Sequence, residues 1–111
     1  MKYTTLSNLP FEHVTHKEDI FKQVFLRKSD VPHILSFSQS TLKVGQRVEE
    51  HAHRDMFEVF FIQSGNGKLM INLKEYDLKP GICVVIEPME KHTLWCTSKE
   101  SLVLLYFGVE S

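Results

Sequence analysis

Short apolar or alternating segments, separated by turn-forming residues, run from Val31 to the end of the chain. They recur about every eight to twelve residues, a spacing typical of a β-sandwich or a β-barrel. We therefore expect an all-β fold, with strands in this part of the chain at residues 33–43, 48–53, 57–63, 67–73, 75–78, 82–87, 93–97 and 102–107.

The turns between these strands carry recognisable signals. The sequence SGNG at 64–67 predicts a hairpin, and KPG at 79–81 places Pro and then Gly where a tight turn needs a fixed and a positive φ. A third turn is unusual, because Leu73 follows Asn72 where a tight hairpin favours Gly. This turn predicts either a strained backbone at Leu73 or a wider loop.

The first thirty residues allow two interpretations. Residues 15–18 match a helix capping box, and Ile20, Phe21, Val24 and Phe25 fit one face of a helix. Residues 20–27 also alternate in the manner of a strand and are rich in aromatic and β-branched residues, so we favour a strand. We expect residues 1–32 to pack on the barrel or on a partner subunit, and residues 33–111 to form the barrel itself, in one structural domain overall.

Length and composition limit the class of protein. The 111 residues suit one domain, and a chain that is 42% hydrophobic and 24% charged is ordinary for a soluble globular protein. The net charge of −1 gives no basic surface for nucleic acid. The longest apolar runs are too short to cross a bilayer, and no apolar block follows the N-terminus. We expect no nucleic-acid partner, no membrane contact and a cytoplasmic location.

The two cysteines, Cys83 and Cys96, lie in separate apolar segments joined by a short loop. A reduced pair that fills the core is the favoured interpretation for a cytosolic protein. The alternative is a regulatory disulfide, if the two segments form a hairpin that aligns the cysteines.

A group of histidines and one glutamate are the candidate functional residues. On a strand, His51 and His53 project from the same side, and after a turn Glu58 lies on an otherwise apolar strand. A lone buried carboxylate is unfavourable unless it meets a cation, and two imidazoles with a divalent metal would supply one. His92 can add a third imidazole. Three histidines and one carboxylate suit Zn, Mn, Fe, Ni or Cu, and the residue types alone do not choose among these metals.

These residues resemble a known family. The first cupin motif, G-x5-H-x-H-x4-E-x6-G, is matched at every spacing by Gly45, His51, His53, Glu58 and Gly65. Gly81 and His92 fit the second motif, G-x5-P-x-G-x2-H-x3-N, which is otherwise altered. Glu87 stands in place of its Pro, Met89 in place of its Gly and Cys96 in place of its Asn. The resemblance covers residues 33–109, about one whole cupin barrel.

The resemblance implies a fold and a site. The fold is a double-stranded β-helix, or jelly-roll barrel, and the site is one divalent transition metal ion bound inside it by His51, His53, Glu58 and His92. Cupins include enzymes, sensors and storage proteins, so the fold does not fix the activity. The first hypothesis is a metal-dependent dioxygenase or isomerase that holds a small polar molecule. The alternatives are a non-catalytic binding or sensing module and a structural dimer that does not need metal. The family suggests a homodimer.

Other candidate residues have weaker support. Glu87 and Glu90 flank His92 and could orient its imidazole, although an ordinary charged loop is favoured. The strand face with His33, Phe37 and Gln39 could line the cavity or pack against the N-terminal strand or another subunit. Five further side chains could wall the pocket, although filling the core is favoured for them. They are Phe60, Met70, Ile86, Trp95 and Phe107.

Overall fold

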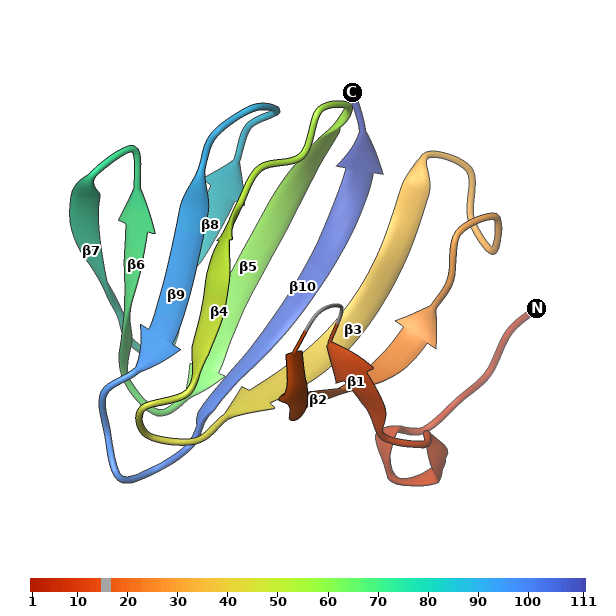
Figure 1. Ribbon diagram of the computed structural model, residues 1–111. Coiled ribbons are helices and arrows are strands. Elements are labelled where there is room, and N and C mark those ends of the chain that lie inside the picture. The colour runs from red at the N-terminus through yellow and green to blue at the C-terminus, as the bar shows by residue number, and fades with distance from the viewer. Residues whose placement is uncertain (15–16) are drawn as a thin grey trace.

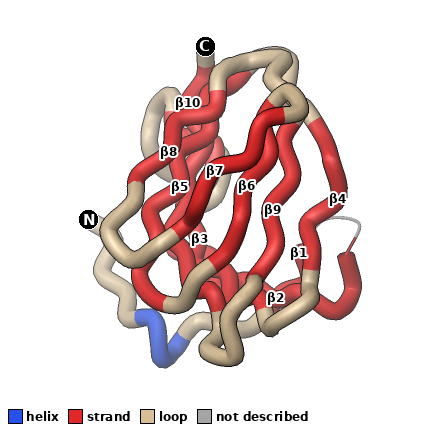
Figure 2. Tube along the Cα trace, turned by 90° about the vertical axis from the view of Figure 1, so that its left-hand side faces the viewer, coloured by secondary structure: helices blue, strands red, loops and turns tan. Residues whose placement is uncertain are grey.

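The protein consists of two antiparallel β-sheets that face each other, as the computed structural model of residues 1–14 and 17–111 shows (Figure 1). A six-stranded sheet has the order β1-β2-β3-β10-β5-β8, and a four-stranded sheet has the order β4-β9-β6-β7. The strands are β1 (Glu12–Val14), β2 (Lys17–Leu26), β3 (Ile34–Leu42), β4 (Arg47–His51), β5 (Met56–Ser64), β6 (Gly67–Ile71), β7 (Lys74–Leu78), β8 (Cys83–Ile86), β9 (His92–Cys96) and β10 (Leu102–Glu110). In Figure 2 the four-stranded sheet lies in front of the six-stranded sheet.

All eight strands expected after Val31 are present, with boundaries that differ by at most three residues at either end. The hairpin expected at residues 64–67 is wrong, because β5 and β6, which these residues connect, lie in different sheets. The N-terminal segment also contains the strand favoured by its alternation, since β2 pairs with β3 along the edge of the six-stranded sheet. The alternative helix is therefore wrong for residues 17–26. Thr15 and His16, which begin the capping-box pattern, lie outside the described residues. A single 3-10 turn, η1 (Leu6–Asn8), is the helical element among the described residues.

The core lies between the two sheets and is built by the alternation of each strand. On β5, Glu58, Phe60 and Ile62 are buried and point inward, whereas Phe61 and Gln63 are exposed. The main buried cluster contains Ile20, Leu42, Phe60, Ile62, Leu69, Leu78, Ile86, Leu94, Cys96, Leu102 and Leu104. Both sheets contribute, so the two inner faces form one continuous apolar layer.

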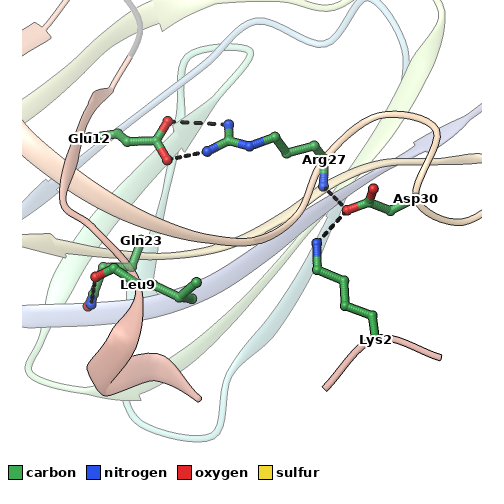
Figure 3. A network of polar contacts seen from close by, with 6 residues as sticks. All are labelled: Lys2, Leu9, Glu12, Gln23, Arg27 and Asp30. Atoms are coloured by element: carbon green, nitrogen blue, oxygen red, sulfur yellow. Dashed lines mark hydrogen bonds and ion pairs between the residues drawn. The ribbon is translucent and has the colours of Figure 1, made fainter. Parts of the chain in front are cut away.

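Polar contacts connect the N-terminal segment to β2 and to the turn that follows β2 (Figure 3). The guanidinium of Arg27 donates two hydrogen bonds to the carboxylate of Glu12, and the Gln23 amide donates to the carbonyls of Leu6 and Leu9. These contacts fix η1 and β1 at the edge of the six-stranded sheet. No described helix has the length and apolar composition that a bilayer crossing requires.

The inward face of β3 is not the one considered from the sequence. Ser36, Ser40 and Leu42 line the cavity between the sheets. The opposite face turns outward, and there the ring of Phe37 stacks on Phe25 of β2 with 4.9 Å between ring centroids. The cavity-lining assignment for His33, Phe37 and Gln39 is therefore wrong, and packing against the N-terminal strand is right for Phe37.

The turn between β6 and β7 is tight and strained. Ile71 pairs directly with Lys74, so only two residues make the connection, and both have positive φ: 49° at Asn72 and 71° at Leu73. This is the geometry of a type I′ hairpin turn, which normally takes Gly at its second position. The expectation of a strained backbone at Leu73 is confirmed, and the wider loop is wrong.

The two cysteines are free and belong to different sheets. Cys83 on β8 pairs with β5 and is exposed, whereas Cys96 on β9 is buried and points into the core. Core packing is therefore confirmed for Cys96 and wrong for Cys83. The aligned hairpin is also wrong, because β8 and β9 do not pair with each other.

Candidate metal centre

Four ligand side chains come together at the end of the barrel where β4 ends and β5 and β9 begin (Figure 1). His51 is the last residue of β4 and His92 is the first residue of β9, and the two residues are directly paired across these strands. Their ring centroids are 4.2 Å apart. Strand pairing between residues distant in sequence thus supplies half of the group.

His53 and Glu58 complete the group from a loop and from the other sheet. β4 ends at His51, so strand alternation does not place His53, but its ring still lies 4.8 Å from the ring of His51. Glu58 is on the inward face of β5, 9% exposed. One potential ligand atom from each of the four residues lies within 4.8 Å of the other three. The four residues expected from the sequence are all in this cluster.

Backbone carbonyls fix the orientation of two imidazoles. His51 Nδ1 donates to the carbonyl of Glu49 at 2.8 Å, and His92 Nδ1 donates to the carbonyl of Glu90 at 2.9 Å. A proton on Nδ1 leaves Nε2 with a free lone pair, which is the form that ligates a metal. Glu90 therefore orients His92 through its backbone, while its carboxylate accepts from the backbone N–H of Glu87.

The electrostatics of the cluster are dominated by Glu58. Burial raises the pKa of Glu58, but contacts with His53 and His92 outweigh burial and lower this pKa to about 2. Glu58 Oε1 lies 3.6 Å from His53 Nε2 and 3.3 Å from His92 Nε2. Contact with Glu58 raises the pKa of His53, whereas burial lowers the pKa of His51. The carboxylate thus remains charged in a largely dehydrated site and attracts a cation.

Two buried nitrogen atoms show that the cluster fits a metal ion. His53 Nε2 and His92 Nε2 are inaccessible to solvent and have no hydrogen-bond partner among the described residues. Buried polar atoms without partners are rare in folded proteins and require an explanation. Ligand atoms on opposite sides of one ion at ~2.1 Å would be up to ~4.2 Å apart. Slight closure of the observed cluster would therefore satisfy both orphaned nitrogens.

Met89, which stands where the second motif has Gly, has a backbone conformation that glycine favours. Its φ is 70°, in the left-handed region that favours glycine, and its backbone N–H donates to the carbonyl of His53 at 2.6 Å. The methionine thus adopts the conformation in which a glycine would be unstrained. This hydrogen bond ties the loop before β9 to the loop that carries His53.

Three residues of the cluster, His51, His53 and Glu58, lie in the wall of a cavity of about 550 Å³, a volume suited to a small molecule. Apolar side chains make much of its wall, and Lys22, Ser40 and Tyr106 add polar groups from β2, β3 and β10. These three residues were not among those predicted from the sequence. The available signals were a lysine between the apolar residues Ile20 and Val24, and a hydroxyl within the apolar run LVLLYF.

Of the five side chains considered as pocket walls, Phe60 lines the cavity. Ile86 belongs to the buried core and Met70 is half-buried on β6. Phe107 contacts Phe37 on the outer face, and Trp95 lies beneath the guanidinium of Arg47, 3.9 Å from the ring centroid. Trp95 is therefore separated from the cavity by its own sheet, and filling the core is right for Ile86 but wrong for Trp95 and Phe107.

Comparisons with known proteins agree with this architecture. Residues 38–108 match the family model described as Cupin domain. A predicted oxalate decarboxylase from Thermotoga maritima has a TM-score of 0.91 at 22% identity, with 99% of this chain and 100% of that chain covered. KdgF from a Halomonas species has a TM-score of 0.82 at 14% identity, with 99% and 96% covered. No curated protein sequence matches the chain. At these identities the structural likeness establishes the fold and not the activity.

Proposed function

The chain belongs to the cupin family, and from this premise we propose that it binds one divalent transition metal ion through His51, His53, Glu58 and His92. In this proposal the ion is Zn, Mn, Fe or Ni, and it holds a small polar molecule in the adjoining cavity. The observation that carries the proposal is the pair of buried imidazole nitrogens, on His53 and His92, that converge on the Glu58 carboxylate and make no hydrogen bond among the described residues.

The number and type of ligand atoms determine how many further ligands a bound metal ion could accept. Three imidazoles and one carboxylate leave coordination positions open on an ion that accepts five or six ligands, so an exogenous oxygen donor has room to bind. A bound ion would act as a Lewis acid toward that donor. The carbonyls of Glu49 and Glu90 hold two imidazoles in the ligating tautomer, and the apolar wall excludes water from the ligand.

The class of reaction is a second and more specific part of the proposal. We favour an enzyme that acts on a small organic acid as a metal-dependent dioxygenase or isomerase, with a non-catalytic binding module as the alternative. One structural relative, described as a predicted oxalate decarboxylase, is by that description also an enzyme of a small carboxylic acid. Oxygen uptake and product analysis with the Fe(II)-loaded protein and a panel of carboxylic acids separate the two. Turnover supports the enzyme, whereas saturable binding without turnover supports the module.

Metal retention by single variants tests the ligand set. We expect His53→Ala to lose at least about ten-fold in metal affinity, because it removes one ligand and opens the site to water. His13→Ala is the matched control, since His13 is an exposed histidine of β1. Metal content after gel filtration is measured by mass spectrometry, with circular dichroism as a check of folding. Equal metal content in the two variants would contradict the assignment.

A further inference from the structure

The cavity contains a second polar cluster, on the six-stranded sheet, formed by Lys22, Ser40 and Tyr106. Lys22 and Ser40 are direct partners across β2 and β3, so their side chains leave the same face of the sheet. Ser40 Oγ donates to the hydroxyl oxygen of Tyr106 at 3.3 Å. The Ser38 side chain also contacts the Tyr106 hydroxyl, so this hydroxyl is held between two serines at the cavity wall.

Lys22 brings a positive charge that the fold offsets only in part, through the nearby carboxylate of Glu12. Its neighbours on the same face of β2, Ile20 and Val24, are buried, so the lysine stem begins among core residues. Its cross-strand partner Glu12 is occupied by two hydrogen bonds from Arg27 (Figure 3). Within the described part of the chain, Lys22 itself makes no ion pair. An ammonium group at the wall of a mostly apolar cavity favours an anionic ligand.

The distance between the two clusters suits a short molecule. Lys22 is on β2 and Glu58 is on β5, three strand intervals apart in the order β2-β3-β10-β5. Lys22 lies in one row with Ser40, Leu104 and Ile62, so it is also offset from Glu58 by four residues along β5. Intervals of ~4.8 Å between strands and ~3.3 Å per residue along them place the two backbones on the order of 19 Å apart along the sheet. The lysine and glutamate side chains and the metal ion cover much of this distance. A ligand a few carbon atoms long can fill the remainder, alongside the apolar side chains of Leu104 and Phe60.

The charges of the loaded cavity point to a dianion. With neutral imidazoles, a divalent ion and Lys22 together exceed the charge of Glu58 by two positive units. Glu49 and Glu50 also border the cavity, but they are exposed to water, where their charges are screened. A ligand with two carboxylates would neutralise the interior, one group at the metal ion and the other at the ammonium.

We propose that the cavity is specific for short dicarboxylic acids and their hydroxy or oxo derivatives, with Lys22 as the residue that selects the second carboxylate. This inference rests on the proposed metal function, since the first carboxylate is held by the ion. Ser40 and Tyr106 supply hydroxyl groups between the two ends. Lys22 is a specificity-determining residue in this arrangement and has no part in holding the metal.

Calorimetric titration with two related acids tests the inference. Malate and lactate share a hydroxyl next to a carboxylate, which can bind the ion, and malate alone has a second carboxylate. We expect the metal-loaded protein to bind malate at least about ten-fold more tightly than lactate, as a charge-assisted hydrogen bond allows. Equal affinities would overturn the inference.

Three lysine variants test whether Lys22 causes the preference for malate over lactate. Lys22→Met keeps the length of the side chain without its charge and is expected to bind malate and lactate equally. Lys22→Arg keeps the charge and is expected to retain the preference for malate. Lys99→Met, at an exposed position outside the strands, is the matched control and should behave as wild type. A full malate preference in folded Lys22→Met would overturn the inference.

Metal analysis of the same samples distinguishes failure of this inference from failure of the proposed function. If the protein holds stoichiometric metal but binds both acids equally, the proposed dicarboxylate specificity is refuted and the proposed metal function stands. If the protein retains no metal, malate is tested against the metal-free protein by thermal unfolding. A larger rise in Tm for wild type than for Lys22→Met would preserve the Lys22 subsite and refute the metal function. Equal rises would refute both.

Discussion

Met89 has a left-handed backbone conformation at the position where the second cupin motif has glycine. Its φ of 70° costs a residue with a Cβ about 1–2 kcal/mol. The strain is maintained by the surrounding contacts, which include the hydrogen bond from Met89 N–H to the His53 carbonyl. The side chain is 64% exposed, so little packing depends on it. The backbone conformation is therefore what matters at this position.

Replacing Met89 with Gly should stabilise the protein by about 0.5–1 kcal/mol. The gain is the relief of left-handed strain, reduced by the larger chain entropy of glycine in the unfolded state. Urea unfolding in the presence of a chelator measures it without a contribution from metal. Met89→Ala retains both the Cβ and the strain, so its stability should stay close to that of wild type. An equal gain in both variants would assign the effect to the exposed side chain instead.

Among the structural elements, the turn from β5 to β6, which connects the two sheets, depends most on a glycine. Gly65 has a φ of 76°, and a Cβ added to it would overlap the backbone oxygen of Ser101, in the segment that leads into β10. Gly81, in the turn before β8, has a φ of 91° but open space around its Cβ position. Both glycines belong to cupin motifs, yet only Gly65 is restricted by a close neighbour.

The two glycines therefore predict different losses of stability. Gly81→Ala should cost about 1–2 kcal/mol, the cost of a Cβ in the left-handed region. Gly65→Ala should cost more than about 3 kcal/mol, because a backbone oxygen must also move. Thermal and urea unfolding of the two variants compare the losses directly. Similar losses in both would mean that backbone conformation alone determines the role of Gly65.

The sequence predicted the elements better than the faces they present. Every expected strand after Val31 was found because alternation and turn residues are local signals. The four metal-site residues were found because their types and spacing are specific. The inner face of β3 was left open because this strand carries polar residues on both faces, so alternation cannot choose between Ser40 and Gln39. Lys22 was missed because only the pairing of β2 with β3 brings it to the cavity.

At the scale of the whole molecule, the outer face of the six-stranded sheet carries a group of apolar side chains beside the hydrogen-bonded pair Gln39 and Gln63. Phe37 lies between Phe25 and Phe107, and β5 and β8 extend the surface with Phe61 and Val85, which are 42% and 55% exposed. Monomeric proteins rarely expose a large continuous apolar patch. A second copy of this sheet can cover such a face by sheet-on-sheet packing. We therefore expect a homodimer.

Sedimentation equilibrium measures the expected dimer as twice the chain mass of 12.9 kDa. Phe61→Lys should shift the protein toward monomer, because it places a charge at the centre of the apolar face. Tyr76→Lys is the matched control, at a side chain of similar exposure on the four-stranded sheet. A wild-type protein that remains monomeric up to ~100 µM, well above the Kd of a stable dimer, would contradict the expectation.

The central claim is that one metal ion is held by three imidazoles and one carboxylate, and X-ray absorption at the metal edge tests it most directly. The account predicts about one metal ion per chain, with a first shell of nitrogen and oxygen at ~2.0–2.2 Å and the outer-shell scattering of about three imidazole rings. That scattering should diminish in His53→Ala. A sulfur shell at ~2.3 Å from Cys83 or Cys96, or a spectrum without imidazole scattering, would contradict the account.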